Sequence, residues 1–214
     1  MTPVRLAAIV EGHGDAKAVP KLIHRIAGRE FPEMMVIVDP VVRVPASQLL
    51  KEGELERQIE RVARQMPSKG GILVLVDCDW ADGCPKHDGP MLLQRARQTR
   101  PDVQISLVLA YREYETWFIA AAESLRGCRG LVLDLIGDPQ PERIRGAKEW
   151  LSDRMPRGRP YSATIDQPAM TGVFDIQAAR RTDSFDKCYR EVVRLLNGLG
   201  ASGGEGDHAP GEGG

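Results

Sequence analysis

The sequence predicts an α/β protein with a mostly parallel central sheet of about four strands flanked by helices. Short apolar runs typical of buried strands alternate with amphipathic helical patterns over residues 1–125. The run ILVLV at 72–76 is continuously apolar, as expected of a central strand covered on both faces. Parallel strands need crossover connections, which the intervening helical patterns supply.

The elements follow one another in a regular order along this first part of the chain. We expect strands at 4–10, 34–38 with an irregular continuation through 41–44, 72–76 and 103–110. We expect helices at 16–27, with Asp15 as the N-cap, and at 52–65, 90–97 and 115–124.

The pattern changes after residue 125. Prolines become frequent, and helical spacing returns only at 144–154 and 184–196. We therefore expect residues 126–196 to form a helical appendage packed on the sheet domain. Residues 197–214 are glycine-rich and almost without apolar side chains, which predicts a flexible tail.

Composition and charge exclude several classes of protein. The chain has 214 residues, with 29 Lys and Arg against 30 Asp and Glu, so a uniformly basic coat protein for nucleic acid is excluded. Four cysteines do not suggest a disulfide scaffold, and no apolar run approaches the ~20 residues that span a bilayer. The first residues lack a secretory signal pattern. We expect a cytoplasmic protein with reduced thiols and no membrane partner.

Acidic side chains follow three of the expected strands. Glu11 ends the first, Asp77 and Asp79 end the central one, and Glu113 and Glu115 follow the fourth. The carboxyl ends of parallel strands meet at one edge of a sheet, which is where such folds bind ligands. Residues i and i+2 of a strand point to the same side, so the two aspartates can face one point. The sequence thus predicts an acidic cluster at this edge.

A hard divalent cation would remove the repulsion among these carboxylates. Carboxylate oxygens suit Mg²⁺ or Mn²⁺, and such a site supports phosphodiester displacement. Each acid alone also has a structural explanation, as a turn residue, a strand terminus or a favourable charge at a helix start. The coincidence of three acidic strand ends favours the metal site.

The same segments resemble a known module. EGHGD at 11–15 after the first strand and DCD at 77–79 after a central apolar strand are similar to the Toprim domain of topoisomerases, bacterial primases and overcoming-lysogenization-defect nucleases. More narrowly, the chain resembles a family of small bacterial Toprim-like proteins of unknown function, often encoded near ATPases. REYETWF at 112–118, YSATIDQ at 161–167 and DSFDKC at 183–188 support this narrower resemblance.

The resemblance implies roles for individual acids. Glu11 would lie near the reacting phosphate as a general base or acid, and Asp77 and Asp79 would bind the metal. Asp15 with Glu113 or Glu115 would complete a second metal position. Where the related stretch is expected to carry a lysine, this chain has Ala163. Another cation would then have to act in its place, or activity has been lost; the candidates are Lys148, Arg112 and Arg43.

Other residues are candidates for binding the substrate. Gly12 and Gly14 permit a tight turn before a helix, where backbone N–H groups can cradle a phosphate. Arg157 and Arg159 lie in the loop MPRGRP with little opposing charge, which favours contact with nucleic acid.

The leading hypothesis is a metal-dependent nuclease or nickase acting in phage defence or DNA processing, with DNA favoured over RNA and an ATPase as partner. Association of the chain with itself is left open. One alternative is a non-catalytic Toprim-like binding subunit. Another is a nucleotide-sugar or phosphomonoester enzyme that uses the D-x-D. A zinc site built from Cys78, Cys84 and His87 is disfavoured, because the spacing lacks a fourth ligand.

Overall fold

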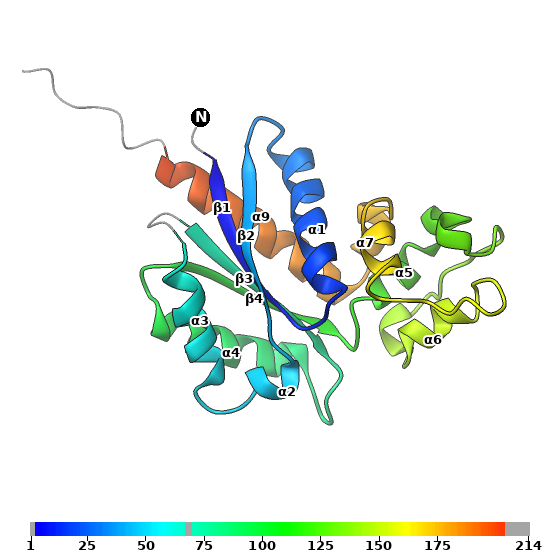
Figure 1. Ribbon diagram of the computed structural model, residues 1–214, viewed down its shortest axis with the longest axis horizontal. Coiled ribbons are helices and arrows are strands. Elements are labelled where there is room, and N and C mark those ends of the chain that lie inside the picture. The colour runs from blue at the N-terminus through cyan, green and yellow to red at the C-terminus, as the bar shows by residue number, and fades with distance from the viewer. Residues whose placement is uncertain (1–2, 67–69, 204–214) are drawn as a thin grey trace, which may run out of the picture.

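Four parallel strands form a single sheet in the computed structural model, which describes residues 3–66 and 70–203 (Figure 1). They are β1 (Val4–Val10), β2 (Val36–Arg43), β3 (Gly70–Cys78) and β4 (Gln104–Tyr111). The order across the sheet is β2-β1-β3-β4, and every neighbouring pair is parallel. The predicted α/β class with about four parallel strands is confirmed.

Helices connect these strands and also follow the last one. Those of the first part are α1 (Asp15–Glu30), α2 (Ala46–Leu49), α3 (Glu54–Ala63) and α4 (Pro85–Thr99). The later ones are α5 (Thr116–Ala120), α6 (Ala147–Ser152), α7 (Asp166–Thr171), α8 (Ile176–Ala179) and α9 (Asp183–Gly203). Short 3₁₀ turns cover Ala122–Leu125, Cys128–Gly130 and Pro141–Arg143.

The sheet is covered on both faces, as the continuous apolar strands predicted. Along β1, Leu6, Ala8 and Val10 pack with α1 and α9 on one face. Ala7 and Ile9 face the opposite way and pack in the core that includes residues of α3 and α4. Because successive residues of a strand point to opposite faces, burial on both sides requires apolar residues at nearly every position.

The last helix differs from the expected appendage. Residues 126–182 do form short helices and turns to one side of the sheet (right in Figure 1), but α9 lies across the sheet itself. Its apolar side chains, including Phe185, Val192 and Leu196, belong to the same core as α1. Residues 197–203, which we expected in a flexible tail, belong to α9, and residues 204–214 of that expected tail lie outside the described residues.

The topology marks a binding position at the carboxyl edge of the sheet. The chain leaves β1 through α1 on one face toward β2, and leaves β3 through α4 on the other face toward β4. Such a reversal between neighbouring strands opens a crevice beyond their carboxyl ends, where open α/β sheets bind ligands. Here the reversal falls between β1 and β3, the strands that lead to Glu11 and Asp77.

No helix within residues 3–66 and 70–203 is long and apolar enough to cross a bilayer.

Candidate functional site

A cavity of about 350 Å³ lies at this carboxyl edge. Four of the predicted acids line it together with one lysine and a wall from α2. The lining residues are Glu11, Ala46, Ser47, Leu50, Asp77, Asp79, Trp80, Glu113 and Lys148. The acids that follow β1, β3 and β4 therefore meet around one space, as the strand-end argument anticipated.

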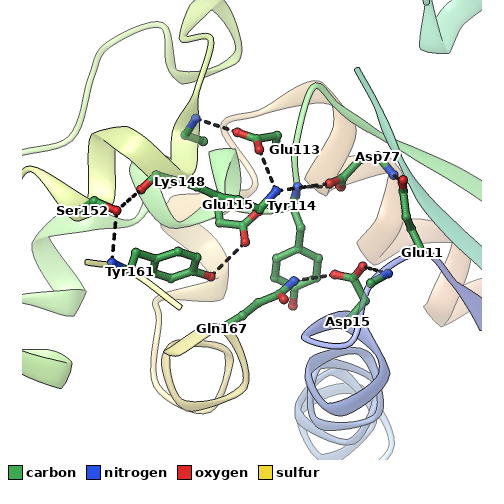
Figure 2. A network of polar contacts seen from close by, with 12 residues as sticks. Glu11, Asp15, Asp77, Glu113, Tyr114, Glu115, Lys148, Ser152, Tyr161 and Gln167 are labelled. Carbon is green, nitrogen blue, oxygen red and sulfur yellow. Dashed lines mark hydrogen bonds and ion pairs between the residues drawn. The ribbon is translucent and has the colours of Figure 1, made fainter. Parts of the chain in front are cut away.

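Glu11 and Asp77 lie side by side at the carboxyl edge of the sheet (Figure 2). Val10 pairs with Leu75 across β1 and β3, which brings the residue after β1 beside the last part of β3. The backbone N–H of Asp77 donates to Glu11 Oε2 at 3.3 Å. The Asp77 carboxylate in turn accepts a hydrogen bond from the backbone N–H of Tyr114 at 2.8 Å through Oδ1.

Both carboxyl groups are held partly away from water. The Asp77 side chain is only 20% exposed. Burial raises the pKa of Asp77 well above its usual range, and the nearby Glu115 charge raises it further. Burial likewise raises the pKa of Glu11, against the lowering effect of backbone hydrogen bonds from Ala46 and Asp77. Crowded carboxyl groups of this kind bind protons or cations readily. Asp79 is exposed at the rim and makes no hydrogen bond or ion pair with the described residues.

Lys148 brings positive charge into the acidic cluster from α6. Its Nζ lies 2.6 Å from Glu113 Oε1, 3.5 Å from Glu115 Oε2 and 3.8 Å from Asp77 Oδ2. The backbone N–H of Ala147 donates to the other Glu113 oxygen at 2.6 Å. Lys148 is thus the cation that joins the helical part of the chain to the sheet edge.

Glu115 is the most deeply buried acid of this group, with 1% of its side chain exposed. The Tyr161 hydroxyl donates to its Oε1 at 2.9 Å. Burial raises the pKa of Glu115 to about 7, although the Lys148 ammonium lowers it. Burial and the Glu115 carboxylate together raise the pKa of Tyr161, so its hydroxyl remains a donor.

Asp15 lies behind the cavity and does not line it. It is the first residue of α1, and Gly14 takes the N-cap position that we expected for Asp15. Its Oδ2 accepts the Gly12 N–H at 2.7 Å, and its Oδ1 accepts Gln167 Nε2 at 2.5 Å. These two hydrogen bonds direct the Asp15 side chain toward Gln167 and the turn at Gly12. Asp15 thus holds α7 against the start of α1.

Gly12 and Gly14, predicted to cradle a phosphate, instead take part in contacts within the protein. The Gly12 N–H is engaged by Asp15. A Cβ at Gly14 would lie 2.5 Å from the Ala163 carbonyl oxygen and would also meet the Gln167 side chain. Gly14 is therefore needed because the 161–167 segment packs directly on its backbone, which blocks the approach of a phosphate there.

The predicted arginines are spread over the surface. Arg43 is exposed at the carboxyl end of β2, and Arg157 is exposed in its loop. Arg112 stacks on the Tyr111 ring, 5.0 Å from the ring centroid. Arg159 donates to Asp166 Oδ1 at 2.9 Å, so its charge is used to stabilise a buried carboxylate. These side chains do not line the cavity as Lys148 does.

A family model described as a domain of unknown function (DUF4276) matches residues 10–192. The chain belongs to the DUF4276 family. The matched stretch includes every residue that lines the cavity, together with Tyr161 and Gln167. Searches of the curated proteins and of the solved structures gave no match.

The donor set of this DUF4276 chain fits a hard cation in chemistry but is not drawn together around one. Glu11, Asp77 and Asp79 offer only oxygens, which Mg²⁺ and Mn²⁺ prefer. Within the described residues no three acidic, histidine or cysteine side chains are close enough to hold an ion as they stand.

Several parts of the site are not among the predicted residues, and Trp80, which lines the cavity next to Asp79, is one of them. The α2 wall of the cavity follows an irregular strand and has no strong helical pattern. Tyr161 and Gln167 bond to Glu115 and Asp15 from more than forty positions away in sequence. Both occur in the YSATIDQ stretch, so that resemblance was the one available signal for them.

Proposed function

We propose that this protein hydrolyses phosphodiester bonds of nucleic acid with Mg²⁺ or Mn²⁺, as a nuclease or nickase. One observation supports this above the others: Glu11, Asp77 and Asp79, from two neighbouring strand ends, line one cavity at the switch point of a parallel sheet. The relation to Toprim domains is part of the same proposal, since it rests on the EGHGD and DCD segments.

Glu11, Asp77 and Asp79 would hold the cation. When bound, the cation supplies positive charge that lowers the cost of the developing charge on the phosphate oxygens. The raised pKa values of Glu11 and Asp77 support this assignment, because carboxylates crowded away from water gain most from a cation.

The proton that the attacking water loses would go to a residue of the chain itself. Hydrolysis forms a P–O bond to a water oxygen and breaks the P–O bond to the leaving oxygen. Glu11, which lines the cavity and accepts a hydrogen bond from the backbone N–H of Asp77, would accept the proton that the water loses. The leaving oxygen would take its proton from solvent, since the cavity is lined in part by the exposed Asp79.

Exposed arginines outside the cavity favour nucleic acid as the substrate. The exposed Arg43 lies on the same edge of the sheet as Glu11, and Arg157 is exposed in the loop after α6. Arginine side chains at these places can contact a phosphate backbone, which makes binding depend on salt. We favour DNA over RNA, a cytoplasmic location and an ATPase partner in phage defence or DNA processing, on the resemblance alone.

The test is cleavage of supercoiled plasmid, linear single-stranded DNA and RNA with Mg²⁺ or Mn²⁺. Wild type is compared with Asp77→Asn and Glu11→Gln, each of which removes charge with little change of shape. We expect nicked or linear product from wild type and a loss of at least about a hundredfold in both variants.

Glu33→Gln is the matched control. Glu33 is an exposed carboxylate in the loop before β2, at the opposite edge of the sheet. It should cleave like wild type. Equal cleavage by wild type, Asp77→Asn and Glu11→Gln would remove the cavity from the reaction.

A non-catalytic binding subunit is the second candidate. Ala163 favours it, since that position is expected to carry a lysine in the related stretch. Metal binding without cleavage, together with activity that returns only with a partner ATPase, would support this candidate. Release of phosphate from small phosphomonoesters, or protection by a sugar nucleotide, would instead support a D-x-D enzyme of another class.

A further inference from the structure

The second metal position implied by Asp15, Glu113 and Glu115 is already filled by the chain's own donors. Each of these carboxylates has both oxygens engaged. Asp15 accepts from Gly12 and Gln167. Glu113 accepts from the Ala147 N–H and Lys148, and Glu115 accepts from Tyr161 and lies against Lys148. A dication there would have to displace several short hydrogen bonds.

The first position is different. Asp79 makes no hydrogen bond or ion pair with the described residues, and Asp77 Oδ2 has only the Lys148 ammonium, at 3.8 Å. Glu11 accepts two backbone hydrogen bonds, a long one of 3.3 Å from Asp77 and one from Ala46. These three side chains retain oxygens that can turn to an ion in the cavity.

The ammonium of Lys148 lies among carboxylates of the implied second metal position. In two-metal phosphoryl sites the ions lie about 3.5–4 Å apart and share a bridging carboxylate. Lys148 Nζ contacts Glu113, Glu115 and the shared Asp77 within 3.8 Å. Among the cavity-lining residues it is the sole positive charge.

The fold fixes Lys148 in this place. Gly146, at φ 72°, is the N-cap of α6, and the Ala147 N–H donates to Glu113 at 2.6 Å. Ser152 Oγ donates to the Lys148 carbonyl at 2.7 Å and accepts the Tyr161 N–H at 3.1 Å. Backbone and side chain of Lys148 are thus both tied to segments that surround the site (Figure 2).

From this geometry we infer that the site binds a single divalent cation and that Lys148 takes the place of the second one. The inference rests on the proposed function and refines it. Lys148 would then be a catalytic residue: with 38% of its side chain exposed, its ammonium can reach a substrate phosphate oxygen while Glu113 holds it.

The experiment counts bound Mn²⁺. The full-length protein is titrated with MnCl₂, and the EPR signal of free Mn²⁺ gives the number of ions bound per chain. Wild type is compared with Lys148→Met. In that variant Glu113 Oε1, Glu115 Oε2 and Asp77 Oδ2 lose the ammonium that they surround. Lys187→Met is the matched control, because Lys187 pairs with Glu191 on α9.

We expect one Mn²⁺ in wild type and in Lys187→Met, and two in Lys148→Met. Plasmid cleavage by Lys148→Met should fall about a hundredfold at Mn²⁺ concentrations that fill only the first site, and should partly recover as the second fills.

Each other outcome is decisive. Two ions in wild type would overturn the single-ion inference and leave the proposed function standing. No bound ion in wild type would overturn the proposed function itself. A single ion in Lys148→Met, with unchanged affinity, would show that the ammonium does not occupy a metal position. The wild-type count decides the inference even if the variant is unstable.

Discussion

Substituting Gly14 by alanine tests how tightly the 161–167 segment packs on the start of α1. Gly14 has φ −65° and ψ −47°, which alanine adopts without strain. On backbone grounds alone the change would stabilise the fold by about 0.4–1 kcal/mol, since the unfolded chain loses freedom. The new Cβ, however, would lie 2.5 Å from the Ala163 carbonyl oxygen and 2.9 Å from its carbon.

The steric cost should exceed the backbone gain. The Ala163 atoms belong to the backbone, so the 161–167 segment has to shift as a unit to restore normal contact. Overpacking of this kind costs about 1–3 kcal/mol. We expect Gly14→Ala to lower the free energy of unfolding by about 1.3 kcal/mol, the difference between the midpoints of the two ranges.

Gly28, inside the helix that Gly14 caps, provides the matched control. It is exposed near the end of α1, and a Cβ there meets nothing within 4 Å. Gly28→Ala should therefore stabilise the protein by about 0.4–1 kcal/mol. Urea unfolding followed by tryptophan fluorescence measures both. A Gly14→Ala protein as stable as wild type, or a destabilised Gly28→Ala protein, would refute this account of the packing.

Three further experiments address the buried acids. Because the Glu115 pKa is raised from 4.5 to about 7, the folded state keeps a proton that the unfolded chain has lost, so metal-free stability should fall as pH rises through this window. Urea midpoints at pH 5 and pH 7.5 test this, and Glu115→Gln should flatten the difference. Tyr161→Phe, which removes the 2.9 Å bond to Glu115, should cost about 1–3 kcal/mol by the same assay. Mn²⁺ at a hundred times its Kd should stabilise wild type by about 2.7 kcal/mol, an increase that Asp77→Asn should lack in thermal unfolding.

The strand-end acids could be predicted because strand geometry is local. A continuous apolar run predicts a covered strand, and parallel strands bring their carboxyl ends to one edge. Those two rules predicted that Glu11, Asp77 and Asp79 lie at the same edge of the sheet. In the structure these three side chains line one cavity. Their function as metal ligands stays a prediction.

The partners of these acids could not be predicted from spacing. Lys148 reaches Asp77 from 71 positions away, and Gln167 reaches Asp15 from 152 positions away. Such contacts depend on how the helical part docks on the sheet, which local patterns do not encode. The position of α9 escaped prediction for the same reason: its apolar stripe indicates a buried face without saying what covers it.

The place of Lys148 means that neither part of the chain can complete the site alone. A fragment that stops at 125 would keep Glu113 and Glu115 but lose the ammonium and the Tyr161 hydroxyl that satisfy them. It would also lose α9 and thereby expose one face of the sheet. During synthesis, the acids emerge from the ribosome well before the groups that neutralise them. The site is therefore complete only after the helical part has folded onto the sheet.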